Sequence, residues 1–169
     1  WKIQSQPPSG KPVAGEVIVK GLRGGHSGLD IHKGRGNAIK ILGRVLLRLS
    51  ELGARVVSLE GGSKRNASPR EAHAVVFLPK SKARKAQKLV AALEETLRAE
   101  VSATDPDLQV AWQDLGEREG TVLKRPLQKK ILQAISGLPH GVTKMSPVIP
   151  DLVETSTNVA VISTSEDTI

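Results

Sequence analysis

The chain has 169 residues, no Cys and a formal net charge of +8, so it fits one domain with a sizeable core and has neither disulfides nor thiolate metal ligands. No apolar run approaches the roughly 18 residues that a membrane span needs, and we expect no membrane partner. The positive charge suggests nucleic-acid binding, but the only aromatic residues are Trp1, Phe77 and Trp112. Because single-strand binders stack bases on aromatic side chains, we expect no nucleic-acid partner.

The ends of the chain and its lack of Cys bear on where the protein resides. The first residues do not have the basic, apolar and small-residue order of a signal peptide. Without a disulfide framework, a cytoplasmic location is the simplest expectation. The chain begins at Trp1 and stops soon after the apolar run 158–162, so we expect both ends to be cuts in a longer protein.

The first third of the chain is expected to form a linker, a strand and a helix. Residues 1–12 contain a cluster of Pro, Gly and Ser that is typical of a linker. A strand is predicted at 13–22, which is rich in Val and Ile and is followed by a turn signal. Apolar residues then recur at three- and four-residue spacing from Asn37 to Leu52. This period predicts a helix with Asn37 as its N-cap.

The middle of the chain completes a common fold. Two β-branched runs, 54–60 and 71–78, predict a hairpin, and the amphipathic pattern of 81–102 predicts a second helix. Alternating apolar and polar residues predict a strand at 108–113. The order β-α-β-β-α-β is typical of an α+β, ferredoxin-like split βαβ fold, in which two helices cover one face of a four-stranded antiparallel sheet. We therefore expect the core at 13–113, with a bare sheet face or an edge strand available to a partner.

Residues 114–169 are expected to form a C-terminal extension beyond this core. The extension is predicted to contain a short helix at 126–136 and an irregular stretch rich in Pro and Gly. A strand is predicted near 153–162, where apolar and β-branched residues gather.

The most distinctive polar residue is His26, in the sequence Gly24-Gly25-His26-Ser27-Gly28. Its small neighbours leave the imidazole exposed and let another backbone approach it closely. From the residues alone, His26 is either a loop residue whose glycines serve turns, or a hydrogen-bond donor or general acid-base group. Ser27 has no nearby base except the adjacent His26, so we do not expect serine hydrolase chemistry.

The remaining polar residues are candidates for binding a metal ion or a substrate. His26, Asp30 and His32 lie close in sequence, but their spacing matches no strong zinc signature, so we expect no metal site within the chain. Asn66 and Arg70 precede a predicted strand, where an amide and a guanidinium could receive a carboxylate. Turn chemistry with a surface ion pair explains the same two residues, and the sequence alone favours that simpler reading.

Several motifs follow one another in order along nearly the whole chain. They are Val19–Gly28, Asp30-Ile31-His32, Gly34–Ala38, Leu59–Gly62, Asn66-Ala67, Pro69–Ala72, Leu138–Val142, Met145-Ser146 and Leu152–Asn158. In this order they resemble the lid domain of aminoacyl-histidine dipeptidases, which are relatives of carnosinase. Ser68 departs from the pattern, because the family usually has an apolar residue there. The zinc-binding motifs of the family's catalytic domain do not occur, as we expect for a lid that is inserted within that domain.

The resemblance implies a zinc metallopeptidase that hydrolyses Xaa-His or similar dipeptides. Two zinc ions and the general base would lie in a catalytic domain outside this chain, with 1–12 leading from that domain and 114–169 leading back towards it. The lid would form a homodimer. His26 matches the family's lid His, which stabilises the oxyanion of the tetrahedral intermediate in the partner's active site. Asn66 matches a lid Asn that holds substrate, and Arg70 is a looser match as a carboxylate-binding residue.

Two functions of other classes stay open at this point. The chain is alternatively a non-catalytic dimerisation or binding module, or a basic nucleic-acid-binding domain. The cut ends and the His-bearing glycine loop favour the enzyme. Because the metal ligands and the base would lie elsewhere, we expect the isolated domain to be inactive.

Overall fold

Strands with alternating burial build an antiparallel sheet in the computed structural model, which describes residues 1–169. The five strands are β2 (Pro12–Lys20), β4 (Arg55–Gly61), β6 (Ala72–Pro79), β7 (Gln109–Gly116) and β11 (Ile162–Ser163). Their order across the sheet is β11-β4-β6-β2-β7. Val17 of β2 lies opposite Ala74 of β6 and Trp112 of β7, so β2 is paired on both sides and β7 is an outer strand.

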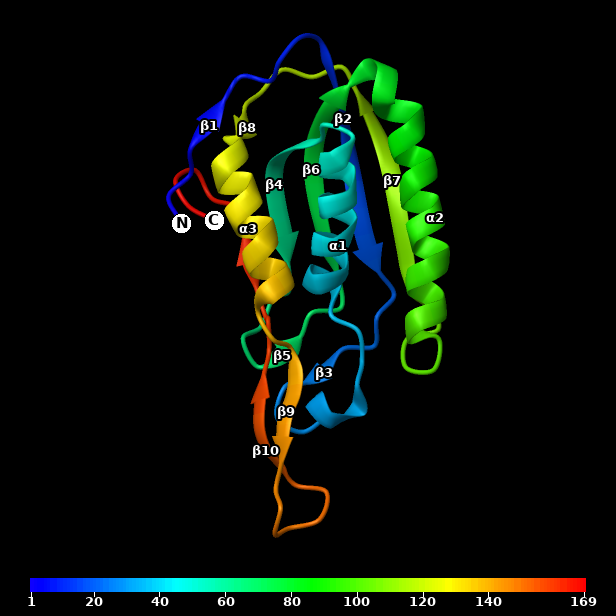
Figure 1. Ribbon diagram of the computed structural model, residues 1–169, viewed down its shortest axis with the longest axis vertical. Coiled ribbons are helices and arrows are strands. Elements are labelled where there is room, and N and C mark those ends of the chain that lie inside the picture. Colours follow the sequence, from blue (N-terminus) through cyan, green and yellow to red (C-terminus); the bar gives the residue numbers. More distant parts are fainter.

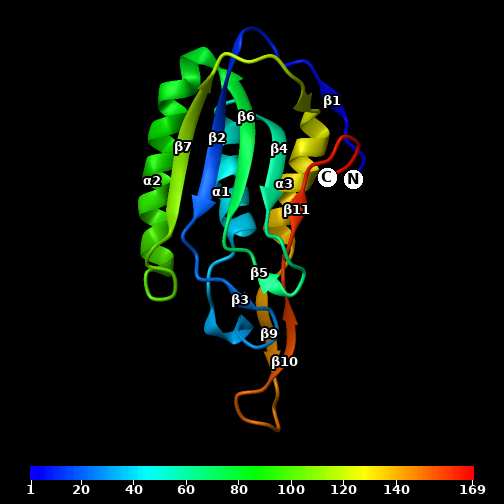
Figure 2. The same ribbon diagram turned by 180° about the vertical axis from the view of Figure 1, so that it is seen from behind.

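Three helices cover one face of this sheet. They are α1 (Ala38–Glu51), α2 (Ala83–Val101) and α3 (Arg125–Gly137). Figure 1 shows all three in front of the sheet, and the view from behind in Figure 2 shows the other face without a helix. The apolar side of α1 is the centre of the core, whereas α2 buries only Ala86, Val90 and Leu97. Most of the surface of α2 is therefore available to a partner.

The predicted β-α-β-β-α-β plan is confirmed by β2, α1, β4, β6, α2 and β7, with both helices on the same face. Asn37 is the N-cap of α1, because its side-chain oxygen accepts from the N–H groups of Ile39 and Lys40. The sheet has five strands rather than the predicted four, because β11 adds to the edge of β4. The extension also supplies α3 to the helix layer.

The single strand predicted near 153–162 is wrong. The structure has two strands there: β10 (Val153–Thr157), which pairs with β9 (Gly141–Met145), and β11, which pairs with β4. Between them the amide of Asn158 donates to the carbonyl of Ala67, and the carbonyl of Val159 accepts from the amide of Asn37. These contacts with two distant loops interrupt the ladder, so the apolar run serves two sheets.

Two more short strand pairs complete the chain. β1 (Ser5–Gln6), within the stretch predicted as a linker, pairs with β8 (Val122–Leu123), and β3 (Gly25–His26) pairs with β5 (Ala67–Ser68). Figure 1 shows β3, β5 and the β9–β10 hairpin together at one end of the molecule, beyond the ends of the long strands. None of the helices is both long enough and apolar enough to cross a bilayer.

Candidate functional site

The predicted site residues come together through the pairing of β3 with β5. Gly25 lies opposite Ser68 and His26 lies opposite Ala67 in this two-stranded ladder. The N–H of Ser27 extends it by donating to the carbonyl of Asn66 at 2.9 Å. His26 and Asn66, 40 positions apart in the chain, therefore lie on neighbouring backbones at the same end of the molecule.

The loop around His26 orients its imidazole. The N–H groups of Gly28 and Leu29 both donate to Nδ1 of His26, each at 3.1 Å. Since backbone N–H groups can only donate, Nδ1 carries no proton in this arrangement, and the neutral ring has its proton on Nε2. The His26 side chain is exposed, so its Nε2–H is a donor that a ligand can reach.

The glycines of the motif are needed where the backbone turns. Gly24 has φ +61° and Gly25 has φ +150°, both in the region that favours glycine. A Cβ at Gly24 would lie 2.4 Å from Cγ of Arg70, and a Cβ at Gly25 would lie 2.7 Å from Cβ of Asp30. Gly28 is needed less strictly, since a Cβ there would come only within 3.3 Å of the His26 ring. The two glycines before His26 therefore allow the loop to fold back on itself.

Charged side chains close the loop from within. Oδ2 of Asp30 accepts from the backbone N–H of His26 at 2.9 Å, and Arg35 donates to the carbonyl of Gly24. The hydrogen bond from Lys33, and after it the one from His26, lowers the pKa of Asp30 to about 2. Asp30 is thus a carboxylate at neutral pH and acts as an acceptor for the loop, which gives it a structural use in place of metal binding.

A residue that sequence reasoning missed holds the base of the loop. Asp105 is 0% exposed, and its two oxygens accept from the N–H groups of Arg23 at 2.8 Å and Gly36 at 2.7 Å. Because Pro106 follows it directly, Asp105 looks like an ordinary turn residue at the end of a helix, and the sequence gives no sign that its carboxylate is buried. The available signal was an acidic residue at a helix end opposite a long glycine loop, which is too weak to identify a contact across 69 positions.

Arg70 and Asn66 occupy different surroundings. Nε of Arg70 donates to the carbonyl of Leu22 at 3.2 Å, and its stem lies along Gly24. Asn66 is exposed, and its side chain makes no hydrogen bond. Ser68, between them, is buried in β5 opposite Gly25. The Asn66 amide is therefore free to bind a ligand, whereas Arg70 also braces the loop that carries His26.

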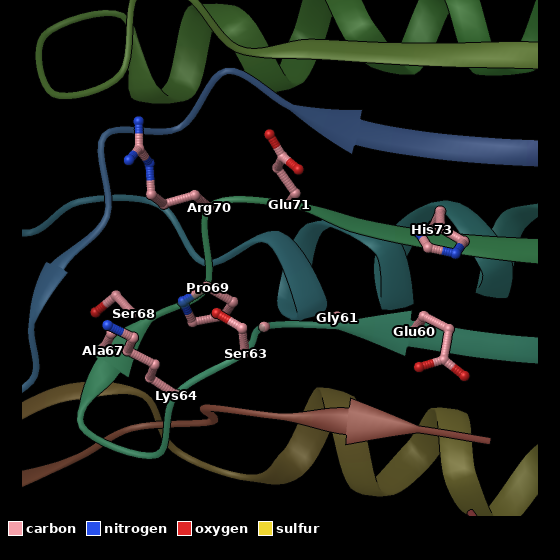
Figure 3. A pocket seen from close by; sticks show the side chains of 11 residues that line it. Glu60, Gly61, Ser63, Lys64, Ala67, Ser68, Pro69, Arg70, Glu71 and His73 are labelled. Carbon is pink, nitrogen blue, oxygen red and sulfur yellow. The ribbon is translucent and has the colours of Figure 1, made fainter. Parts of the chain in front are cut away.

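A polar cavity lies beside these residues. It has a volume of about 580 Å³ and is lined by polar residues that include Glu60, Lys64, Glu71 and His73 (Figure 3). In Figure 3 the guanidinium of Arg70 points away from Lys64, towards the segment between β2 and β3. Arg70 lines the cavity, whereas His26 and Asn66 do not.

A metal ion finds no suitable set of ligands in this chain. No group of three or more His, Cys, Asp or Glu residues is close enough together to hold one. Asp30 is engaged by the loop, and His32 lies exposed in the 3-10 turn η1 (Ile31–Lys33). Residues 1–169 therefore do not by themselves fit a zinc centre.

Comparisons with known proteins match this domain to parts of larger enzymes. A family model described as a peptidase dimerisation domain matches residues 17–105. The cytosol non-specific dipeptidase of Escherichia coli (strain K12) is 32% identical over 155 residues, which are 91% of this chain and 32% of that protein. The crystal structure of aminoacylhistidine dipeptidase from Vibrio alginolyticus matches with a TM-score of 0.94 and 37% identity, over 99% of this chain and 34% of that one. The chain thus spans about a third of the length of each relative.

Proposed function

The chain belongs to the peptidase dimerisation domain family, and from this premise we propose that it is the lid and dimerisation domain of a two-zinc dipeptidase that hydrolyses Xaa-His or similar dipeptides. The Escherichia coli relative is a non-specific dipeptidase and the Vibrio alginolyticus relative is an aminoacylhistidine dipeptidase, which supports a dipeptidase. The Escherichia coli enzyme is cytosolic, which supports a cytoplasmic location. The zinc ions would be held outside residues 1–169, where they would polarise the peptide carbonyl and activate water.

His26 is the residue of this chain that would act on the transition state. Its Nδ1 is occupied by two backbone donors, so Nε2–H is presented outwards as a hydrogen-bond donor. A fixed donor of this kind stabilises the negative charge that grows on the carbonyl oxygen when the peptide bond is attacked. The pair of backbone N–H donors on Nδ1 of His26 is the single observation on which the proposal depends most.

Substrate contacts would come from the neighbouring loop. Asn66 has an exposed amide without a partner, and its backbone is joined to Ser27 beside His26. The amide can thus bind a peptide that also reaches Nε2 of His26. Arg70 keeps its terminal guanidinium nitrogens for a carboxylate, although Nε is bound to Leu22. We assign the carboxylate of the dipeptide to Arg70 and its backbone amide or carbonyl to Asn66.

Dimerisation would use the edge of the sheet at β7. The opposite edge is closed, because N–H groups of β4 donate to the side chains of Gln128 and Thr164 and β11 covers its end. On β7 the N–H of Val110 donates to Glu94 of α2 at 3.1 Å. After Val110 the outer edge of β7 has no partner strand. An eight-residue edge strand beside a mostly exposed helix favours pairing with a second copy.

The test is His26→Ala in the full-length enzyme. We expect kcat to fall by roughly 10²–10³-fold with little change in KM, as for the loss of one oxyanion donor. His32→Ala is the matched control, because His32 is exposed six residues away and makes no side-chain hydrogen bond. If both variants were as active as the parent, the chain would be a dimerisation module without a catalytic role.

Mixing experiments separate action within a subunit from action across the dimer. His26→Ala protein is mixed, under subunit exchange, with protein that is inactivated in its catalytic domain. Hybrid dimers should regain one working site, because the donor and the catalytic half then come from different subunits. Lack of any recovery, with hybrid formation verified, would place the donor in its own subunit's site.

A further inference from the structure

We propose that Asp105 is a positioning residue that sets the geometry of the His26 loop by binding both of its ends at once. The inference rests on the proposed function only for its consequence in catalysis. We call the two hydrogen bonds from the N–H groups of Arg23 and Gly36 to the Asp105 carboxylate the latch, and its existence does not depend on the proposed function.

Asp105 is unusual in the chain because its side chain is fully buried without a cationic partner. No Lys or Arg forms a salt bridge with it. A buried carboxylate is costly unless hydrogen bonds replace its hydration. Here two backbone N–H groups do so, and both bonds are short, at 2.8 and 2.7 Å. The cost of burial is thus offset only while both donors stay in place.

The two donors bracket the functional loop. Arg23 is the last residue before the glycine motif, and Gly36 is the last residue before Asn37, the N-cap of α1. Residues 24–35, which include His26 and η1, therefore leave and return to the same carboxylate. One side chain thereby fixes the separation of the two ends of the loop.

Asp105 has a rigid footing of its own. Its backbone N–H donates to the carbonyl of Val101 at the end of α2, and its carbonyl accepts from Leu108 just before β7. Gly36 fits closely against this site, since a Cβ there would lie 2.8 Å from the side chain of Leu22 and 3.5 Å from the carboxylate. Because Asp105 is fixed between α2 and β7, its carboxylate holds the ends of the loop in a constant position relative to these two elements.

The tip of the loop is held separately. β3 pairs with β5 near His26, and the N–H of Ser27 binds Asn66. With the base fixed by Asp105 and the tip fixed by β5, the turn between them places Gly28 and Leu29 against Nδ1 of His26. Release of the base would let that turn relax and free the ring to change tautomer.

Asp105→Asn tests the latch in the present chain. The amide of Asn has the shape of the carboxylate but only one acceptor oxygen, so one of the two N–H donors would face an NH₂ group. We expect amide hydrogen exchange at Arg23, Gly36, Gly28 and Leu29 to accelerate about tenfold or more, while amides of the central strands change little. The ¹⁵N signals of the His26 ring should change from a single Nε2–H tautomer to a mixture.

Asp107→Asn is the matched control, because Asp107 lies two residues away, is exposed and makes no side-chain hydrogen bond. Unchanged exchange at Arg23 and Gly36 in folded Asp105→Asn protein would overturn the proposal. Equal acceleration of every amide would overturn it as well, since that result describes global destabilisation. If Asp105→Asn does not fold, amide exchange in the wild-type chain still tests the latch. The amides of Arg23 and Gly36 must then be protected to a similar degree, and rapid exchange at either one contradicts the latch.

The catalytic consequence is tested in the full-length enzyme by a double-mutant cycle. We expect Asp105→Asn to lower kcat about tenfold with little effect on KM, and to have no further effect when His26 is already Ala. Additive losses would mean that Asp105 does not act through His26. If His26→Ala itself has no effect, the proposed function fails, while the exchange and tautomer measurements still decide the latch.

Discussion

At the scale of single residues, the orientation of the His26 imidazole depends on backbone groups. The N–H groups of Gly28 and Leu29 donate to Nδ1 of His26 and so favour the tautomer with its proton on Nε2. The turn of the backbone after His26 sets the position of these two N–H groups. Gly25 is central to this geometry because its φ of +150° and its closeness to Asp30 leave no room for a side chain. The loop is therefore sensitive to a single methyl group.

Gly25→Ala is expected to destabilise the protein by about 1–3 kcal/mol in urea unfolding, because it adds backbone strain and a clash with Asp30 and Arg35. Gly34→Ala is the control, since Gly34 has φ +64° but nothing within 4 Å of a Cβ. It should cost only about 1 kcal/mol, the strain of the left-handed conformation alone. Equal losses in the two variants would show that the packing around Gly25 contributes nothing.

Sequence reasoning reached part of this residue-scale description. The small neighbours of His26 predict an exposed imidazole, and the side chain is exposed in the structure. The tautomer could not be predicted, because it depends on the turn that brings Leu29 back to Nδ1. Asp105 could not be found either, since its two donors are 82 and 69 positions away and no local pattern links them.

At the scale of elements, the start of α1 connects the helix layer to the β9–β10 hairpin. The side chain of Asn37 caps α1 through its oxygen and donates from its nitrogen to Val159 and to Nδ1 of His140. Next to it, Nζ of Lys40 donates to the carbonyls of Ile135, Ser136 and Leu138 at the end of α3. The side chains of Asn37 and Lys40 thus join the start of α1 to the end of α3 and to the two ends of the β9–β10 hairpin.

This junction is expected to respond to pH. Burial, and after it the charge of Lys40, lowers the pKa of His140 below its ordinary 6.5. A lowered folded-state pKa means that the unfolded chain takes up the proton first. The stability that neutral His140 contributes is therefore present above about pH 6.5 and is lost as the pH falls through that value towards the folded-state pKa.

We expect amide exchange of the hairpin, corrected for the intrinsic pH effect, to accelerate between about pH 7 and pH 5. His140→Gln should remove this change, because Gln does not titrate. His73→Gln is the control, since His73 is exposed on β6. A hairpin whose protection followed the same pH course in the parent and in His140→Gln would exclude His140 as the cause.

Element prediction succeeded where a local period decides the structure. The three- and four-residue spacing from Asn37 to Leu52 predicts α1 correctly, and the N-cap is the predicted residue. The segment near 153–162 failed because its apolar run looks continuous, whereas Asn158 and Val159 are bound by distant loops. The helix predicted at 81–102 begins two residues later, at Ala83, because the turn η2 (Lys80–Lys82) precedes α2.

At the scale of the whole molecule, the short strand pairs, the outer sheet edge and the bare sheet face lie on different surfaces. One end holds β3, β5 and the hairpin, the outer edge of the sheet holds β7 beside α2, and the rear face has no helix (Figures 1 and 2). The plan of the sheet was predictable because the order of its elements restricts the topology. The fifth strand was not, because a two-residue strand such as β11 has no periodic signal of its own.

Pairing through β7 predicts that the double variant Ala111→Lys with Gln113→Lys weakens the dimer of the full-length protein. Both positions are exposed on the outer strand, and like charges would face each other across a two-fold axis. We expect the dissociation constant from sedimentation velocity to rise at least about tenfold. Thr121→Lys with Gln133→Lys adds the same charge at exposed positions away from this edge and should leave the dimer intact. A dimer equally stable in both variants would exclude β7.

The closure of residues 24–35 by Asp105 is independent of redox conditions. Secreted domains often close a long loop with a disulfide, whose integrity depends on the oxidising power of the surroundings. This chain has no Cys and closes residues 24–35 with a carboxylate and two backbone N–H groups. Such a closure involves no electron transfer, so glutathione or thioredoxin cannot open it. The loop that carries His26 therefore keeps the same shape in reducing and oxidising surroundings.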